Sequence, residues 1–94
     1  MVEIIGEAAA LEMLAEECVE LAQAALKLAR VERGENPASV SEDHAQSDLM
    51  EEWADVLICS EYLDEMAWFK PQVVDQCIRV KKRRAMERIR HEQN

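Results

Sequence analysis

The stretch AEECVELAQAALK, residues 15–27, decides the fold of this chain, because it reads as a helix that carries charge beside its apolar side. Apolar residues recur about every 3.6 residues in and around this stretch, and this period predicts one helix over residues 7–32. Glu17 and Glu20 lie one turn apart within it, next to the apolar side. Such a position for two carboxylates calls for an explanation beyond solvation. The apolar positions that give this period are Leu11, Leu14, Cys18, Leu21, Ala22, Ala25, Leu28 and Ala29.

Two further helices follow from the same kind of pattern. The second is predicted over residues 46–68, with Leu49, Trp53, Val56, Leu57, Ser60 and Leu63 on one broad face. The third is predicted from Pro71, which suits a first helical turn, to about residue 91. Its apolar positions are Val74, Ile78, Ala85 and Ile89. The chain therefore contains about three main helices.

A polar segment, RGENPASVSEDHAQS, separates the first two predicted helices. Gly34 can end the first helix, with Pro37 shortly beyond it. Ser41 or Ser47 can cap the second helix. A loop of about a dozen residues is long for a simple connection, so its length favours a functional role.

Length and composition favour one small all-α domain over residues 1–94. About half of the residues are apolar, and there are only two Gly and two Pro. A bundle of three such helices leaves apolar surface exposed. We therefore expect oligomerisation to complete the bundle, as a homodimer or a homotetramer.

The net charge of −9 is unevenly distributed. Residues 79–94 carry seven Lys or Arg against two Glu, so residues 1–78 carry −14. An acidic body disfavours a nucleic-acid partner, because nucleic acids are polyanions. It is compatible with a polyphosphate that arrives with a divalent metal.

The cysteines and the N-terminus predict a cytoplasmic protein. Cys18, Cys59 and Cys77 have no metal-binding spacing and lie in apolar helical patterns, so we expect buried, reduced thiols. The N-terminal segment has no basic region and no long apolar run, which predicts neither a signal peptide nor a membrane partner.

Acidic residues three apart occur five times in this chain, and most such pairs only face solvent. Two pairs border apolar sides on different predicted helices: Glu17 with Glu20, and Glu52 with Asp55. If those helices pack antiparallel, four carboxylates share one pocket, and their repulsion requires cations. Hard oxygen ligands select Mg²⁺, with Mn²⁺ as a substitute. The spacing therefore indicates a metal site for phosphate chemistry.

Two motifs extend this interpretation. EECVELAQAALK, residues 16–27, and EEWADVLI, residues 51–58, resemble the paired EExxE and ExxD motifs of MazG-like nucleotide pyrophosphohydrolases, in the all-α NTP pyrophosphatase superfamily. The ending KKRRAMERI is similar to the KxxRxxxRI ending of that family. The interval of 31 residues between Glu20 and Glu52 is slightly longer than is usual there. The resemblance therefore implies no particular base specificity.

The resemblance implies a Mg²⁺-dependent hydrolase that converts a (d)NTP to a (d)NMP and pyrophosphate. It implies that either Glu16 or Glu20 orients or deprotonates the attacking water. It also implies a set of metal ligands: Glu17, Glu20, Glu52 and Asp55.

Five further residues are candidates for substrate binding, each with a structural alternative. Lys27 lies two turns after Glu20, where it contacts phosphate or extends along the surface. Trp53 stacks on a base or packs in the core. Cations near the C-terminus contact phosphate oxygens or pair with the acidic body. These cations are Lys81, Arg84 and Arg88.

Two other functions stay open. One is an enzyme of the same superfamily that acts on dUTP, dCTP or phosphoribosyl-ATP. The other is a non-catalytic helical interaction module that uses its acidic face to bind a partner.

Overall fold

The computed structural model describes residues 1–35 and 40–93, and these residues are almost entirely helical. A short first helix, α1 (Val2–Ile5), precedes the long helix α2 (Glu7–Glu32). Helix α3 (Glu42–Glu61) continues into a 3-10 turn, η1 (Tyr62–Glu65), and α4 (Pro71–Gln93) ends the described chain. The all-α class and the three long helices are thereby confirmed.

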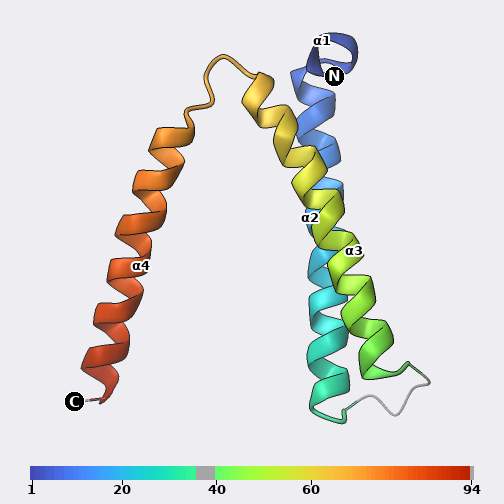
Figure 1. The fold of residues 1–94 in the computed structure, drawn as a ribbon, viewed down its shortest axis with the longest axis vertical. Coiled ribbons are helices and arrows are strands. Elements are labelled where there is room, and N and C mark those ends of the chain that lie inside the picture. Colours follow the sequence, from blue (N-terminus) through green and yellow to red (C-terminus); the bar gives the residue numbers. More distant parts are fainter. Residues whose placement is uncertain (36–39, 94) are drawn as a thin grey trace.

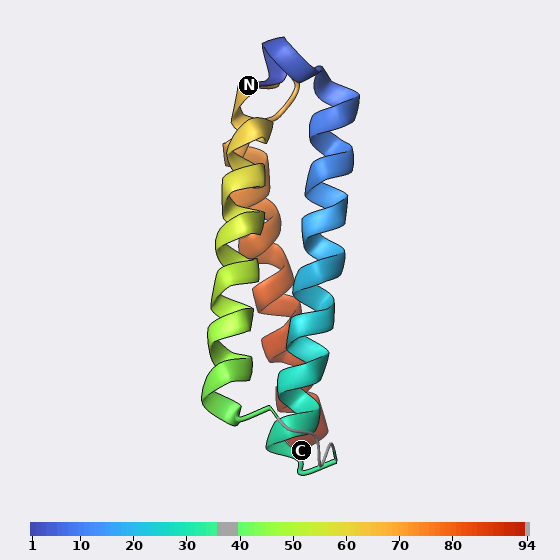
Figure 2. The same ribbon diagram turned by 90° about the vertical axis from the view of Figure 1, so that its right-hand side faces the viewer.

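Helices α2 and α3 form an antiparallel hairpin and lie side by side in both views (Figure 1 and Figure 2). Small side chains fill the contact between them, since Ala10 and Ala45 are each 1% exposed. Cys59 is buried on the same side of α3. Small residues let two helix backbones approach closely, which brings longer side chains at neighbouring positions together.

Residues between α2 and α3 explain where α2 ends and where α3 begins. Gly34 adopts a positive φ of 68° just beyond α2, a conformation that glycine adopts without strain. Ser41 caps α3, because its Oγ accepts a hydrogen bond from the backbone N–H of His44 at 3.1 Å. The cap is Ser41 and not Ser47, so α3 begins four residues before the predicted residue 46. Pro37 lies outside the described residues.

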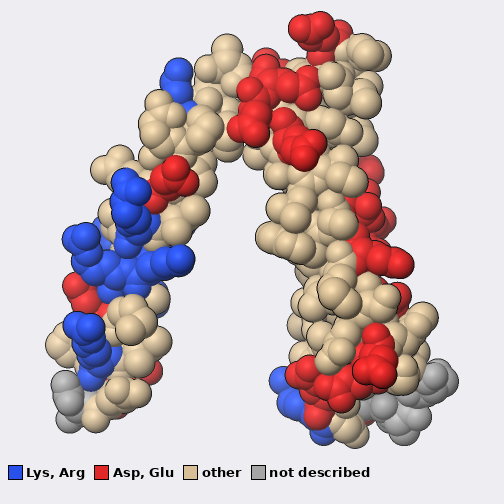
Figure 3. All heavy atoms as spheres, in the orientation of Figure 1, with Lys and Arg blue, Asp and Glu red and all other residues tan. Residues whose placement is uncertain are grey.

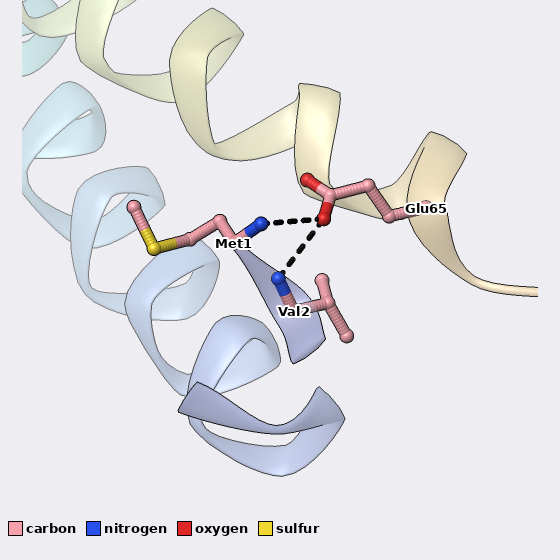
Figure 4. A network of polar contacts seen from close by, with 3 residues as sticks. All are labelled: Met1, Val2 and Glu65. Carbon is pink, nitrogen blue, oxygen red and sulfur yellow. Dashed lines mark hydrogen bonds and ion pairs between the residues drawn. The ribbon is translucent and has the colours of Figure 1, made fainter. Parts of the chain in front are cut away.

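The end of α3 differs from the prediction of a helix to residue 68. After η1, Met66 is extended and only 3% exposed. The carboxylate of Glu65 accepts hydrogen bonds from the N-terminal amine of Met1 at 2.8 Å and the backbone N–H of Val2 at 2.9 Å (Figure 4). These contacts with the start of the chain stop the helix, and a local sequence pattern cannot show them.

Helix α4 diverges from the hairpin (Figure 1). Among the described residues it packs along neither α2 nor α3, and all of its side chains are exposed except Val80 and Ala85, which are half-buried. The molecule is consequently flat, with extents of 45 × 42 × 17 Å. No helix in the described part of the chain has both the length and the apolar character for crossing a membrane.

The cysteine prediction was right for one residue of three. Cys59 is buried, whereas Cys18 and Cys77 are exposed. Both exposed thiols lie on helix faces that have no covering element among the described residues, which is why their apolar patterns did not lead to burial.

Candidate functional site

The antiparallel hairpin brings carboxylates of both sequence motifs to one point. Glu17 and Glu20 project from successive turns of α2, and Glu52 projects from α3 opposite them. One carboxylate oxygen from each of the three lies within 4.8 Å of the other two. Three residues separated by up to 35 positions thus form one compact cluster, which we call the carboxylate cluster.

Two carboxylate oxygens of this cluster are shielded from solvent and have no hydrogen-bond donor among the described residues. Oε2 of Glu17 and Oε2 of Glu52 have almost no exposed surface and accept no hydrogen bond from any described residue. Shielding a polar oxygen without a donor costs free energy, so such atoms in a native protein usually have a partner. A cation placed between the carboxylates would supply that partner.

The cluster raises the pKa of two of its own members. The pKa of Glu17 lies above its ordinary value of 4.5, chiefly because the carboxyl loses hydration, and then because the Glu20 carboxylate is close. The pKa of Glu52 is also raised, first by lost hydration and then by the charges of Glu20 and Asp55. The folded chain therefore favours a proton, or another positive charge, at this point.

Asp55 lies near the cluster but outside its compact part. Its charge contributes to the raised pKa of both Glu17 and Glu52, yet its side chain is exposed. The structure therefore brings together three of the four predicted metal ligands and leaves the fourth beside them. Glu16 is exposed and is likewise outside the cluster.

An open hollow of about 510 Å³ adjoins the carboxylates, between α2 and α3. Lys27 lines it and is half-buried, so the cation predicted to meet phosphate lines the same hollow as Glu20. The sequence analysis missed Gln23 and Asp48, which line the same hollow. Their spacing could have predicted this position. Gln23 is three residues after Glu20 and Asp48 is four residues before Glu52, and helical positions three or four apart are neighbours on one face.

The other predicted substrate contacts lie elsewhere in the single chain. Trp53 is 51% exposed and lines a separate apolar hollow with Leu21, Leu49 and Met50. The three C-terminal cations belong to α4, which packs along neither helix of the hairpin among the described residues. These are Lys81, Arg84 and Arg88. One chain by itself does not bring them to the carboxylates.

The donor set fits a hard divalent cation. Carboxylate oxygens are the ligands that Mg²⁺ and Mn²⁺ prefer, and the two shielded oxygens have no other partner among the described residues. Mg²⁺ usually binds through few protein carboxylates and leaves positions for water and substrate phosphate. The open hollow lined by Glu20 and Glu52 has the volume of a small-molecule site.

Comparisons with protein-family models, with curated proteins and with solved structures find no match for this chain. An all-α hairpin supports many functions, so a functional conclusion has to rest on the site.

Proposed function

We propose that this chain is a Mg²⁺-dependent nucleoside triphosphate pyrophosphohydrolase of the MazG-like type, which converts a (d)NTP to a (d)NMP and pyrophosphate. The observation that carries the proposal is the carboxylate cluster, in which Glu17, Glu20 and Glu52 meet within 4.8 Å. Each of the two resembling motifs contributes to it, although they lie on different helices. Mn²⁺ is the expected substitute for Mg²⁺.

Each part of the site has a role in this proposal. Glu17 and Glu52 hold the cation through their shielded oxygens, and Glu20 and Asp55 complete the charge around it. When bound, Mg²⁺ neutralises phosphate charge and acts as a Lewis acid toward the phosphoryl group. The half-buried Lys27 contacts phosphate oxygens from the wall of the hollow.

The attacking water needs a carboxylate that accepts its proton. Glu20 belongs to the cluster and also lines the hollow, so it can meet both the cation and a water beside the substrate. Glu16 is exposed one position before Glu17 and is farther from the hollow lining. Of the two carboxylates considered from sequence, the geometry favours Glu20.

The surroundings favour a metal-bound polyphosphate over nucleic acid. Acidic side chains dominate the hairpin and basic ones gather on α4 (Figure 3). A bare polyanion is repelled by the hairpin, whereas a nucleoside triphosphate that carries Mg²⁺ has much of its charge neutralised. The proposal includes a cytoplasmic homodimer or homotetramer, because the exposed α4 is typical of a helix that packs in an assembly.

A panel of nucleotides tests this function. The purified chain is incubated with Mg²⁺ and each (d)NTP, with dUTP, dCTP and phosphoribosyl-ATP included, and the products are followed by ³¹P NMR. We expect a monophosphate and pyrophosphate. Glu20→Gln and Asp55→Asn should each lower turnover by at least about 100-fold, because even changes to residues that only hold metal ligands in place cost about 10–100-fold.

The control is Glu61→Gln, which removes one carboxylate from the exposed end of α3 and should hydrolyse at the wild-type rate. Far-UV circular dichroism confirms that all variants keep their helices. Equal turnover in the wild type and in both site variants would contradict the proposal. Absence of turnover on every nucleotide would favour the non-catalytic interaction module.

A further inference from the structure

The hollow between α2 and α3 extends along the hairpin away from the carboxylate cluster. Its α2 wall runs from Glu20 to Lys27, and its α3 wall runs from Glu52 back to Ala45. Because the helices are antiparallel, both walls lead from the cluster toward the end of α2 and the start of α3, over about 10 Å at 1.5 Å per residue. A ligand that fills the hollow therefore has one end at the cluster and the other near the start of α3.

Small side chains keep the middle of the hollow open. Ala24 is half-buried and Ala45 is 1% exposed, and both line the hollow. Neither side chain can form a hydrogen bond with a ligand. Beyond the cluster, the polar side chains of the described lining are therefore Gln23 and Lys27 from α2 and Asp48 from α3.

The two charged residues beyond the cluster lean in opposite directions along the hollow. Helix side chains incline toward the N-terminus of their own helix, and α2 and α3 run in opposite directions. Lys27 consequently extends toward Glu20, at the cluster end. Asp48 extends away from Glu52, and its Oδ2 lies 3.5 Å from Nε2 of His44, one turn nearer the start of α3. The hollow thus has a lysine for the cluster end and a carboxylate at its far end.

A carboxylate at the far end favours a neutral donor on the ligand. Asp48 lies four residues before Glu52, about 6 Å farther from the cluster along α3. An ionised carboxylate accepts hydrogen bonds and donates none, and its contact with His44 leaves other acceptor positions free. It repels phosphate oxygens, which carry the same charge. The ligand group that meets Asp48 therefore carries O–H or N–H donors and no negative charge.

In a nucleotide whose phosphates meet the cation, the sugar is the first such group. It is joined directly to the α-phosphate, whereas the base lies one group farther away. The 2′- and 3′-hydroxyls of ribose are adjacent donors that match the two oxygens of one carboxylate. Acidic side chains bind ribose hydroxyls in this way in dinucleotide-binding folds.

We propose that Asp48 binds the 2′- and 3′-hydroxyls of ribose, so that the site prefers ribonucleoside triphosphates to their 2′-deoxy counterparts. The polyphosphate lies at the cluster end, within reach of Lys27, and the sugar lies over the alanines at the far end. A 2′-deoxyribose has one donor fewer for the carboxylate. The inference rests on the proposed function and adds the sugar of the substrate to it.

Paired kinetics on ribose and deoxyribose substrates test this role of Asp48. The ratio kcat/KM is measured with Mg²⁺ for ATP and dATP, and for CTP and dCTP. The wild type should prefer the ribose form by about tenfold, the lower end of the range for a hydrogen bond to a charged group, because Asp48 is 38% exposed. Asp48→Ala removes both acceptor oxygens and should reduce the preference to below about twofold.

The matched control is Asp43→Ala, which removes an exposed carboxylate of α3 that does not line the hollow and should keep the wild-type preference. A wild type without preference for ribose would overturn the inference, as would an Asp48→Ala variant that keeps the preference. Equal losses on both sugars would assign Asp48 to the cation, and a changed order of bases at a constant sugar ratio would assign it to the base. Either result would also overturn the inference.

Binding separates this inference from the proposed function. Absence of hydrolysis of every nucleotide would contradict the function, and titration calorimetry then decides the role of Asp48. The probes are α,β-methylene-ATP, which cannot be cleaved between its first two phosphates, and its 2′-deoxy counterpart, each with Mg²⁺. The wild type should bind the ribose analogue about tenfold more tightly, and Asp48→Ala should lose this difference. Absence of binding of both analogues by the wild type would overturn the inference.

Discussion

At the scale of single residues, the carboxylate cluster is an arrangement that the folded chain tolerates at a cost. Glu17, Glu20 and Glu52 repel one another, and two of their oxygens have lost water without gaining a donor among the described residues. The proposed cation would relieve both costs.

Lowering the pH from 7 toward 4.5 should raise the melting temperature of the metal-free protein. The folded chain raises the pKa of Glu17 and Glu52 above the ordinary 4.5, through lost hydration and neighbouring carboxylates. Protonation of such a group stabilises the fold. This stabilisation is complete below the pKa that the carboxyl has in the unfolded chain, and it is lost as the pH rises through the pKa that the carboxyl has in the folded chain. Melts followed by circular dichroism in EDTA measure it.

Two variants isolate this effect from the other acids. Glu52→Gln should melt higher than the wild type at pH 7 and respond less to pH, whereas Glu61→Gln should follow the wild type. The pKa of Glu65 is lowered by the N-terminal amine, so its contribution is lost only as the pH falls below about 4.5, outside this range. The same pH response in all three proteins would show that the cluster is not strained.

The sequence predicted much of this site from two pairs of acids on two helices. Helical spacing placed Glu17 with Glu20, and Glu52 with Asp55, on common faces, but spacing does not determine how two helices are rotated against each other. That rotation depends on how the two helices pack through small buried residues, such as Ala10 on α2 and Ala45 on α3. The packing brings Glu52 inward and leaves Asp55 at the edge, which no pattern within one helix could show.

At the scale of elements, the cap of α3 positions half of the site. Ser41→Ala removes the hydrogen bond from the backbone N–H of His44 to Oγ, 3.1 Å long, and should lower the free energy of unfolding by about 1 kcal/mol. Urea denaturation measures the change. Ser47→Ala is the control, because Ser47 is exposed inside α3 and alanine is the better helix former. Equal losses in both variants would contradict the assignment of the cap.

The helix boundaries show what local patterns capture. The first and third predicted helices agree with α2 and α4 within two residues, because Gly34 and Pro71 mark their ends locally. The second does not end as predicted, since Glu65 and Trp68 bind residues at the start of the chain. Helix α1 was not predicted, because four residues are too short for a periodic signal.

At the scale of the whole molecule, charge and packing divide the chain into an acidic hairpin and a basic helix. The sequence predicted three long helices and an unequal charge, but not the divergence of α4 from the hairpin. The connection before α4 is tied to the start of α2, because Trp68 donates a hydrogen bond to Glu7, which lies 61 residues earlier in the chain. Such a contact follows from the tertiary structure alone.

Mn²⁺ binding measured by electron paramagnetic resonance tests most directly whether the hairpin joins its carboxylates around a divalent cation. The wild-type chain should take up Mn²⁺ saturably, and Mg²⁺ should displace it. Glu52→Gln should weaken Mn²⁺ binding at least about tenfold, because even mutations of residues that only support metal ligands lower metal affinity by about 10–100-fold. Glu61→Gln should bind Mn²⁺ like the wild type. Absence of saturable binding, or equal binding by Glu52→Gln, would contradict the claim.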